Sequence, residues 1–248
     1  TWHAAGLVTT LRDTESQTKL AQYSLDLYND LERVTGQSTG FIKCGSIQLA
    51  TSDAKQEEMR RGCAMARSFG VSNSEISPKE VKELFPLAYV DDLKCGFYFP
   101  DDGRVNPADV TQALAKGAKK MGVKILENLP VLDVIVENGK ACGVKTLEGE
   151  IKAEVVVLCP GMWGYEMGNK IGVNIPLQAA EHYYLISEPI PEVHNKLPIL
   201  CDPGRCAYAR EEAGKILLGF FEPNAAPWSE KRIPENFCFD EIQPDWDR

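Results

Sequence analysis

The sequence lacks long hydrophobic runs, clustered metal ligands and an excess of basic residues. No stretch approaches the roughly 18 apolar residues that a membrane-spanning helix needs, so we expect no membrane insertion. None of the 8 cysteines forms a C-x-x-C pair and only 3 histidines occur, so we expect no bound metal. The formal net charge of -9 argues against a broad nucleic-acid surface, because such a surface needs clustered Lys and Arg.

Two further absences concern the cofactor and the compartment. No G-x-G-x-x-G motif occurs, so the usual fingerprint for binding a dinucleotide is missing. The cysteines are scattered and form no disulfide framework, which indicates a reducing compartment such as a bacterial cytoplasm or the mitochondrial matrix. The chain opens on Thr1 rather than Met, and no terminal element is evident by pattern, so we expect a fragment of a longer protein.

What is present indicates a globular chain with helices and strands. With 44% hydrophobic residues in 248, the chain has enough apolar surface for a sizeable core. An Asn138-Gly139 pair predicts a hairpin, and the apolar run at 155–158 predicts a strand covered on both faces. Helices are predicted at 20–31, 78–85, 107–121 and 165–171, and strands at 46–50, 123–126, 131–136, 141–147, 155–158, 183–187, 206–210 and 216–220. This pattern predicts an α/β or α+β class with two interleaved lobes.

A few residues could carry chemistry. His3 lies among small residues that would let a flat ligand approach, although a surface or capping role fits its spacing as well. The turn at Gly161 could face an anion or simply pack, and His182 could act as an acid or base or lie in the core of a strand. Tyr208 and Arg210 share one strand face, where the guanidinium could bind a substrate carboxylate or be an ordinary surface group. The Asp101-Asp102-Gly103 sequence predicts a turn rather than a metal site.

Several short motifs occur together in one order along the chain. They are Trp2-His3-Ala4-Ala5-Gly6, Thr35-Gly36, Gly45-Ser46-Ile47 with Leu49-Ala50, Leu84-Phe85-Pro86-Leu87, Pro100-Asp101-Asp102-Gly103, Pro130-Val131, Gly161-Met162-Trp163 and the pair Tyr208 and Arg210. With these motifs in this order, the sequence resembles the flavoproteins that demethylate N-methylated glycines, the sarcosine and dimethylglycine dehydrogenase family within the D-amino-acid-oxidase-like group. The similarity covers essentially the whole chain.

The resemblance implies a bound FAD and a set of residues around it. His3 would bond covalently to the flavin 8α-methyl carbon, and His182 and Tyr208 would line the substrate side. Arg210 is added as a candidate for the substrate carboxylate from its charge and position. Further contacts to FAD would come from Thr1, Trp2, Ala4, Ala5, Gly6, Leu7, Val131, Gly161 and Trp163.

The resemblance also implies a two-lobed D-amino-acid-oxidase-like fold. An incomplete FAD-binding lobe would comprise about residues 1–40 and 100–175, and an antiparallel-sheet substrate lobe about 41–99 and 176–248. The glycine fingerprint would precede Thr1, and a tetrahydrofolate-binding region would lie beyond Arg248.

The implied reaction is oxidative demethylation of sarcosine or dimethylglycine by hydride transfer to flavin N5, with an electron-transfer flavoprotein as a candidate electron acceptor. One alternative is a non-catalytic regulator resembling the pyruvate dehydrogenase phosphatase regulatory subunit. The presence of His3 counts against it, because a regulator has no evident need for a flavin tether. Another alternative is an amine oxidase that uses oxygen.

Overall fold

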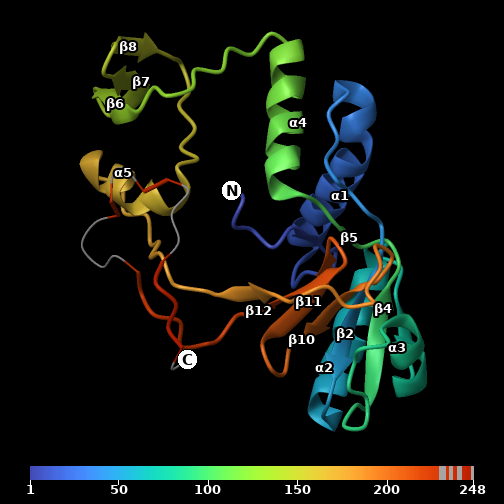
Figure 1. Cartoon of the computed structure of the whole chain (residues 1–248). Helices are drawn as coiled ribbons and strands as arrows, with labels where there is room; N and C mark the ends of the chain where they lie inside the picture. Colours follow the sequence, from blue (N-terminus) through green and yellow to red (C-terminus); the bar gives the residue numbers. More distant parts are fainter. Residues whose placement is uncertain (229–232, 235–236, 239–241, 247–248) are drawn as a thin grey trace. The chain divides into compact units, whose positions relative to one another are not determined.

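The computed structural model describes residues 1–228, 233–234, 237–238 and 242–246 (Figure 1). The chain divides into two compact units, the first formed by residues 1–124 and 183–223 and the second by 125–182 and 224–248. Each unit therefore consists of two separate stretches of the chain. The predicted FAD-binding and substrate lobes are defined by what they bind, so their boundaries stay a prediction. The end of the predicted substrate lobe lies partly outside the described residues.

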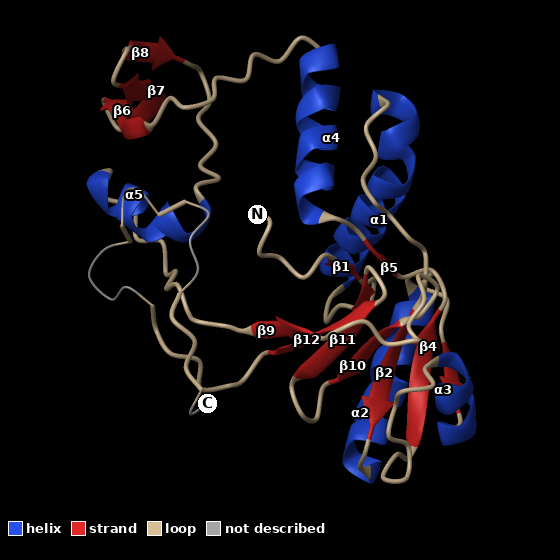
Figure 2. Cartoon of the chain, viewed as in Figure 1, coloured by secondary structure: helices blue, strands red, loops and turns tan. Residues whose placement is uncertain are grey.

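A mixed seven-stranded sheet forms the centre of the first unit (Figure 2). The strands follow the order β3-β4-β2-β10-β11-β12-β9, and only β2 and β10 pair in parallel. Their bounds are β2 (Ser46–Ala50), β3 (Ser74–Ile76), β4 (Cys95–Phe99), β9 (Tyr184–Ile186), β10 (Ile199–Asp202), β11 (Ala207–Glu212) and β12 (Lys215–Phe220). A separate two-stranded ladder joins β1 (Leu7–Val8) to β5 (Gly103–Arg104). The strands predicted at 46–50, 183–187, 206–210 and 216–220 are confirmed close to their predicted bounds.

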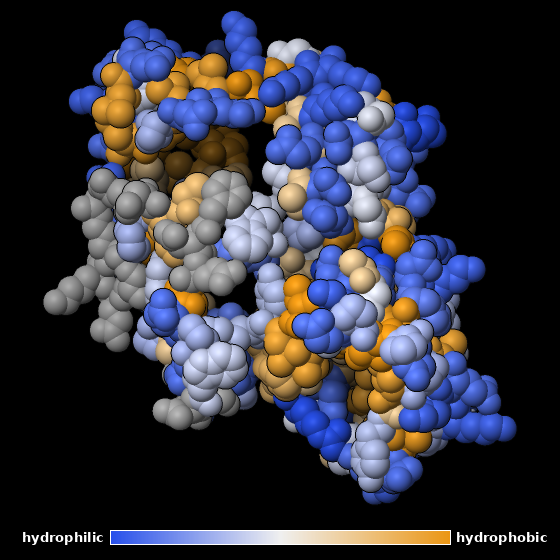
Figure 3. Space-filling view, in the orientation of Figure 1, coloured by the Kyte–Doolittle hydropathy of each residue, from blue (hydrophilic) through white to orange (hydrophobic). Residues whose placement is uncertain are grey.

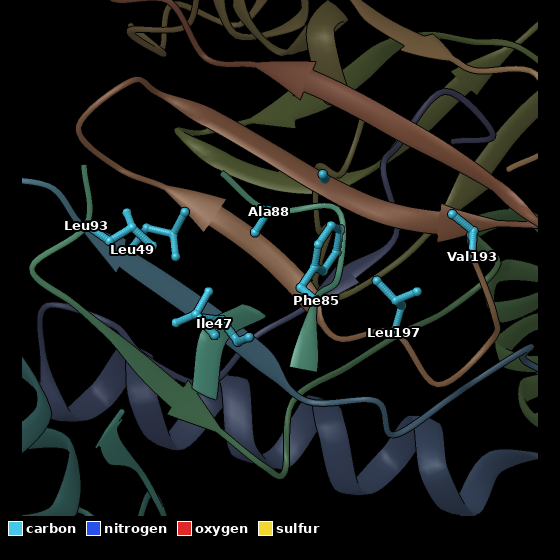
Figure 4. Packing of buried hydrophobic residues seen from close by; sticks show 9 residues of the cluster. Ile47, Leu49, Phe85, Ala88, Leu93, Val193 and Leu197 are labelled. Atoms are coloured by element: carbon cyan, nitrogen blue, oxygen red, sulfur yellow. The ribbon is translucent and has the colours of Figure 1, made fainter. Parts of the chain in front are cut away.

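Buried side chains cover both faces of this sheet. Successive residues of a strand point to opposite faces, so Ile47 and Leu49 of β2 serve one core and Ala50 serves another. The first core includes Val81 of helix α3 (Pro78–Leu84). Figure 4 shows other side chains of this core, among them Ile47 and Leu49. The second core includes side chains from helix α2 (Asp53–Ser68). Helices therefore pack on both faces of the sheet and hold its strands in place.

The helices begin where their capping residues predict. Helix α3 has the expected capping box, in which Ser77 accepts from the Glu80 N–H while the Glu80 carboxylate accepts from the Ser77 N–H. Helix α4 (Pro107–Lys120) starts after Asn106, whose side chain accepts from two backbone N–H groups. Helix α1 (Glu15–Thr35) ends at Gly36 in the left-handed conformation.

Burial along α1 differs in part from what its apolar residues suggest. In the helix predicted at 20–31, Leu20 and Tyr23 are 65% exposed, whereas Leu31 is 6% exposed. Thr18 and Thr35 are buried together with Leu31. Threonine methyl groups pack as apolar surface when the hydroxyl bonds back to the helix, as Thr35 does to the Leu31 carbonyl oxygen. Hydrophobicity alone therefore did not show which side chains of α1 are buried.

The second unit contains a small antiparallel sheet and one short helix. Strands β6 (Val131–Glu137), β7 (Lys140–Thr146) and β8 (Gly149–Lys152) pair in sequence order. The Asn138-Gly139 turn has positive φ at both residues, 51° and 75°, which confirms the predicted hairpin. A 3-10 turn, η1 (Gly161–Trp163), leads into α5 (Gly164–Lys170), where a helix was predicted.

Two predicted strands are wrong. Residues 123–126 and 155–158 form no strand, and Val155 and Val157 are 76% and 77% exposed. A strand exists only where a neighbour supplies its ladder of hydrogen bonds, and no described segment pairs with either run. Figure 3 shows apolar side chains at the surface around β6, β7 and β8, and Leu147 there is 74% exposed.

Three findings concern features that are absent from the described part of the chain. No described helix is long and apolar enough to cross a membrane. No cluster of three or more His, Cys, Asp or Glu side chains in the described ranges could hold a metal ion. The cysteines are free thiols, and Cys44, Cys63 and Cys95 are buried.

Candidate functional site

The first ten residues form an arm that is fixed along the first unit, and we call residues 1–10 the N-terminal arm. Leu7 and Val8 pair with β5, and the Gly6 carbonyl oxygen accepts from the N–H of Val105 at 2.9 Å. Gly6 has φ +70°, and a Cβ there would lie 2.3 Å from the Val105 carbonyl oxygen. Only glycine fits this close backbone approach. The arm therefore depends on Gly6 for its path.

A buried carboxylate fixes the far end of the arm. Asp102 is 1% exposed and accepts from the Thr10 N–H at 2.9 Å, the Thr10 hydroxyl at 2.7 Å and the Ser46 hydroxyl at 2.6 Å. Burial raises the pKa of this carboxyl, and the bonds from Ser46 and Thr10 oppose the shift. Asp102 therefore ties the arm to strand β2. The turn predicted here is present at residues 100–101, but the anchoring role of the second carboxylate was missed.

Arg210 holds the arm nearer to its start. Its Nε donates to the Ala5 carbonyl oxygen at 2.5 Å, and its Nη1 donates to the Glu211 carbonyl oxygen at 2.7 Å. Its Nη2 forms an ion pair with the Glu212 carboxylate, and the Arg210 side chain is 5% exposed. The predicted contact with a substrate carboxylate stays a prediction. The hydrogen bonds in the structure connect Arg210 to the backbone of the N-terminal arm.

A second ion pair lies in the same region of the first unit. Arg104 of β5 pairs with Glu211 of β11, and both side chains are largely buried. Burial lowers the pKa of the Arg104 guanidinium, and the nearby positive charge of Arg210 adds to this effect. Charged residues of both signs on β11 therefore support the arm through Arg210 and strand β5 through Glu211. Sequence reasoning considered Arg210 but not Arg104 or Glu211.

His3 lies on the arm two residues before the carbonyl group that Arg210 holds. The residue is exposed, and its ring centroid is 3.8 Å from that of Trp2 at an interplanar angle of 53°. The backbone turns here, because the Ala4 N–H donates to the Thr1 carbonyl oxygen. An imidazole in this position is accessible to a ligand and is carried by a backbone that is fixed immediately after it.

A row of polar and aromatic residues crosses the large sheet on the face that also carries Arg210. The pairing registers place Gln48, Cys201, Tyr208, Gly219 and Tyr184 side by side on β2, β10, β11, β12 and β9. Burial raises the pKa of the Cys201 thiol to about 12, so this cysteine is protonated and inert at neutral pH. Tyr208 lies in the middle of the row and Tyr184 at its end, and these two tyrosines are its chemically useful members.

Tyr208 is fixed by its neighbours in this row. A Cβ at Gly219 would lie 2.3 Å from both Cζ and Oη of Tyr208, so the missing side chain of Gly219 makes room for the phenol ring. The ring also packs on Phe221, with centroids 5.1 Å apart. Burial raises the pKa of the Tyr208 phenol, and nearby Tyr184 adds to the shift. The phenol is thus a positioned, protonated group that can donate a hydrogen bond.

Four other predicted residues belong to the second unit. Val131 begins β6, and Gly161 and Trp163 bound η1, where Gly161 has φ +57° and open space around its Cα. His182 is exposed and precedes β9, so the prediction that it lies within a strand is wrong. The described backbone at His182 lacks the ladder of a strand because pairing with β12 begins only at Tyr184.

Comparison with known families gives one match along nearly the whole chain. The family model described as FAD dependent oxidoreductase (DAO) matches residues 1–246. Among solved structures, L-proline dehydrogenase from P. horikoshii has a TM-score of 0.84 at 24% identity, covering 98% of this chain and 62% of that chain. At that identity the likeness shows a shared fold.

Curated relatives are similar over most of the chain. The sequence is 38% identical over 99% of its length to 4-methylaminobutanoate oxidase (formaldehyde-forming) of Paenarthrobacter nicotinovorans. It is 32% identical over 100% of its length to human mitochondrial sarcosine dehydrogenase. It is also 38% identical over 90% of its length to the mouse mitochondrial pyruvate dehydrogenase phosphatase regulatory subunit. The chain spans only 30%, 27% and 26% of these three relatives, respectively.

Proposed function

Because this chain belongs to the family of FAD-dependent oxidoreductases, we propose that it forms part of a flavoenzyme that oxidatively demethylates an N-methylated glycine. Sarcosine and dimethylglycine are the first candidates. Support comes from relatives whose names specify sarcosine and 4-methylaminobutanoate, which share a carboxylate and an N-methyl group. The observation that carries the proposal is the exposed His3 on a firmly anchored arm.

The arm fits a tethered flavin on structural grounds. Gly6 packs tightly against Val105, the residue after β5, which fixes the path of the backbone after His3, while the imidazole itself stays exposed. We propose that a ring nitrogen of His3 bonds to the flavin 8α-methyl carbon. The new N–C bond replaces one C–H bond of the methyl group and the N–H bond of the imidazole. An acceptor such as dioxygen takes up the two electrons and two protons that are released, giving hydrogen peroxide.

We expect His3→Ala to lose covalent flavin completely, because no other group would replace the imidazole nucleophile. The measurement is visible absorbance of pellet and supernatant after acid precipitation of the purified complete protein. Wild-type protein should keep its yellow colour in the pellet, and the variant should not. The control is His194→Ala, since His194 is exposed in a loop that flanks the α3 side of the sheet. Colour retained in the pellet of His3→Ala would contradict the assignment.

Tyr208 supports the substrate side of the proposal. When bound, the flavin supplies the oxidation by accepting a hydride from the N-methyl carbon. The substrate amine must be neutral for this step, and a phenol that stays protonated can donate a hydrogen bond to its nitrogen without acting as a base. We propose that Tyr208 orients the amine in this way. His182 is proposed to orient the substrate or to accept its ammonium proton.

Replacing Tyr208 with Phe should lower turnover by about 10–100-fold while FAD content stays near that of the wild type, since one positioning hydrogen bond is lost. Steady-state kinetics with sarcosine and dimethylglycine, together with flavin content, measure both effects. Tyr98→Phe is the matched control, because Tyr98 packs against the core on the opposite face. Unchanged turnover in Tyr208→Phe, or an equal loss in the control, would remove the assigned role.

A regulatory role is the alternative that one relative favours. The regulatory subunit is as similar in identity as the oxidase from Paenarthrobacter, so overall similarity does not separate the two. Acid precipitation does, because a regulator without flavin leaves both pellet and supernatant colourless. Yellow colour in the supernatant alone would instead give a flavoprotein without the His3 bond. Transfer of electrons to an electron-transfer flavoprotein, and of the one-carbon unit to tetrahydrofolate, stay predictions for the complete protein.

A further inference from the structure

A side chain of the sheet anchors the arm close to His3. Pairing with β5 begins at Leu7, and the Val105 N–H donates a hydrogen bond to the Gly6 carbonyl oxygen. Between these contacts and His3 the arm has Ala5, whose carbonyl oxygen accepts from Arg210. The bond from Ala4 to Thr1 is local and does not connect the arm to the sheet. The guanidinium therefore holds the backbone two residues after His3.

We propose that Arg210 is a positioning residue that fixes the His3-bearing end of the arm for flavin attachment. This inference rests on the covalent link proposed above. The guanidinium reaches two backbone carbonyl groups and one carboxylate at once, namely those of Ala5, Glu211 and Glu212. Because the group is planar, three acceptors in different directions fix its orientation. The side chain is 5% exposed, so it has little freedom to swing away.

The same bonds argue against a direct role in binding substrate. A guanidinium has five N–H groups, and the described contacts use one on each of its three nitrogens. A forked bond to a second carboxylate through Nε would have to displace the Ala5 carbonyl group. That exchange would release the arm that carries His3. Arg210 therefore acts through the backbone of the arm and is separate from the groups that touch the substrate.

The effect on flavin attachment follows from positioning. An imidazole held close to the reacting carbon reacts as part of one complex, and a mobile imidazole loses that advantage. Without the Arg210 bond, the backbone at Ala5 would lose its hydrogen bond to the sheet, and the next constraint after Ala5 along the arm is the close packing of Gly6. We expect Arg210→Met to slow covalent attachment by at least about 10-fold. Arg210→Lys keeps the positive charge and one donor, so it should recover part of the rate.

The experiment follows the rate of covalent attachment in flavin-free complete protein after addition of FAD. Samples are denatured with acid at intervals, and protein-bound flavin fluorescence is compared with total flavin. Glu212→Gln is a milder variant that keeps a hydrogen-bond acceptor and should slow attachment less than Arg210→Met. Val81→Ala is the control for lowered stability, because Val81 is buried in the core beside α3 and should leave the rate unchanged. An unchanged rate in Arg210→Met, or the same loss in Val81→Ala, would overturn the proposal.

Amide hydrogen exchange separates this inference from the proposed function. In Arg210→Met, exchange at residues 4–8 should rise above the wild-type level, whereas Val81→Ala should leave the arm protected. If wild-type protein never binds flavin covalently, the link to His3 fails by itself. Faster exchange in Arg210→Met would then still support Arg210 as the residue that positions the arm. Unchanged exchange would overturn that role whatever happens to the flavin.

Discussion

Gly6→Ala should abolish covalent flavin attachment and lower the free energy of unfolding by about 2–5 kcal/mol. A left-handed alanine costs about 1–2 kcal/mol, and forcing a methyl group into filled space costs about 1–3 kcal/mol more. The group in the way is the Val105 carbonyl oxygen, 2.3 Å from the new Cβ. The arm can avoid it only by leaving β5, which moves His3 as well.

Gly214→Ala is the matched control for Gly6→Ala. Gly214 has φ +77° in the turn between β11 and β12, close to the +70° of Gly6, but nothing lies within 4 Å of the position that its new methyl group would take. Gly214→Ala should therefore lower the free energy of unfolding by about 1–2 kcal/mol, the cost of a left-handed alanine, without any steric overlap. Urea unfolding and acid precipitation of both variants give the comparison. Equal stability losses with flavin still attached would show that the arm does not depend on close packing at Gly6.

The fold could be predicted from the sequence where local signals and packing agree. Caps at Asn106 and Ser77 and the turn at Asn138-Gly139 set their elements because short-range hydrogen bonds and backbone geometry decide them. The mixed α/β class and the D-amino-acid-oxidase-like fold are confirmed by the family match and by the solved structure with the same fold. The run at 155–158 failed because its hydrophobicity gives no information on whether a partner strand is beside it.

The candidate site was predictable in part. His3 and Tyr208 were given their roles through motif resemblance and Arg210 through its charge and position, and these roles stay predictions. Asp102 was assigned only to a turn, since its partners Thr10 and Ser46 are 92 and 56 residues away in sequence. No local pattern reports contacts at such separations. For the same reason the charge of Arg210 could be read from the sequence, but its hydrogen bond to the Ala5 carbonyl oxygen could not.

Asp102→Ala should lower the free energy of unfolding by about 2–5 kcal/mol, because buried donors lose their acceptor. The N–H and hydroxyl of Thr10 and the hydroxyl of Ser46 would all be left without it. Asp102→Asn should cost less, since its amide oxygen still accepts from Thr10. Asp101→Asn is the neighbouring control, because Asp101 makes a half-exposed ion pair with Lys43 that is worth at most about 1 kcal/mol. Denaturant unfolding of the variants measures these differences.

The asparagine variant also tests the charge state of Asp102 through pH. Burial raises the pKa of this carboxyl above its ordinary 3.8, because the residue is almost fully enclosed and the attraction of Arg12 is the weakest opposing effect. The folded state then holds the proton more tightly than the unfolded state. This contribution to stability is complete below 3.8 and is lost as the pH rises through the raised pKa. Asp102→Asn lacks this contribution, because an asparagine side chain does not titrate.

On acidification from neutral pH towards about 4, wild-type protein should therefore gain stability relative to Asp102→Asn. Unfolding free energies of both proteins at matched pH values isolate the effect, because their other titrating groups are shared. A wild-type protein that loses stability relative to the variant on acidification would show that the bonds from Thr10 and Ser46 outweigh burial. The arm would then be anchored by an ionised carboxylate, and its hold on His3 would weaken as the pH falls.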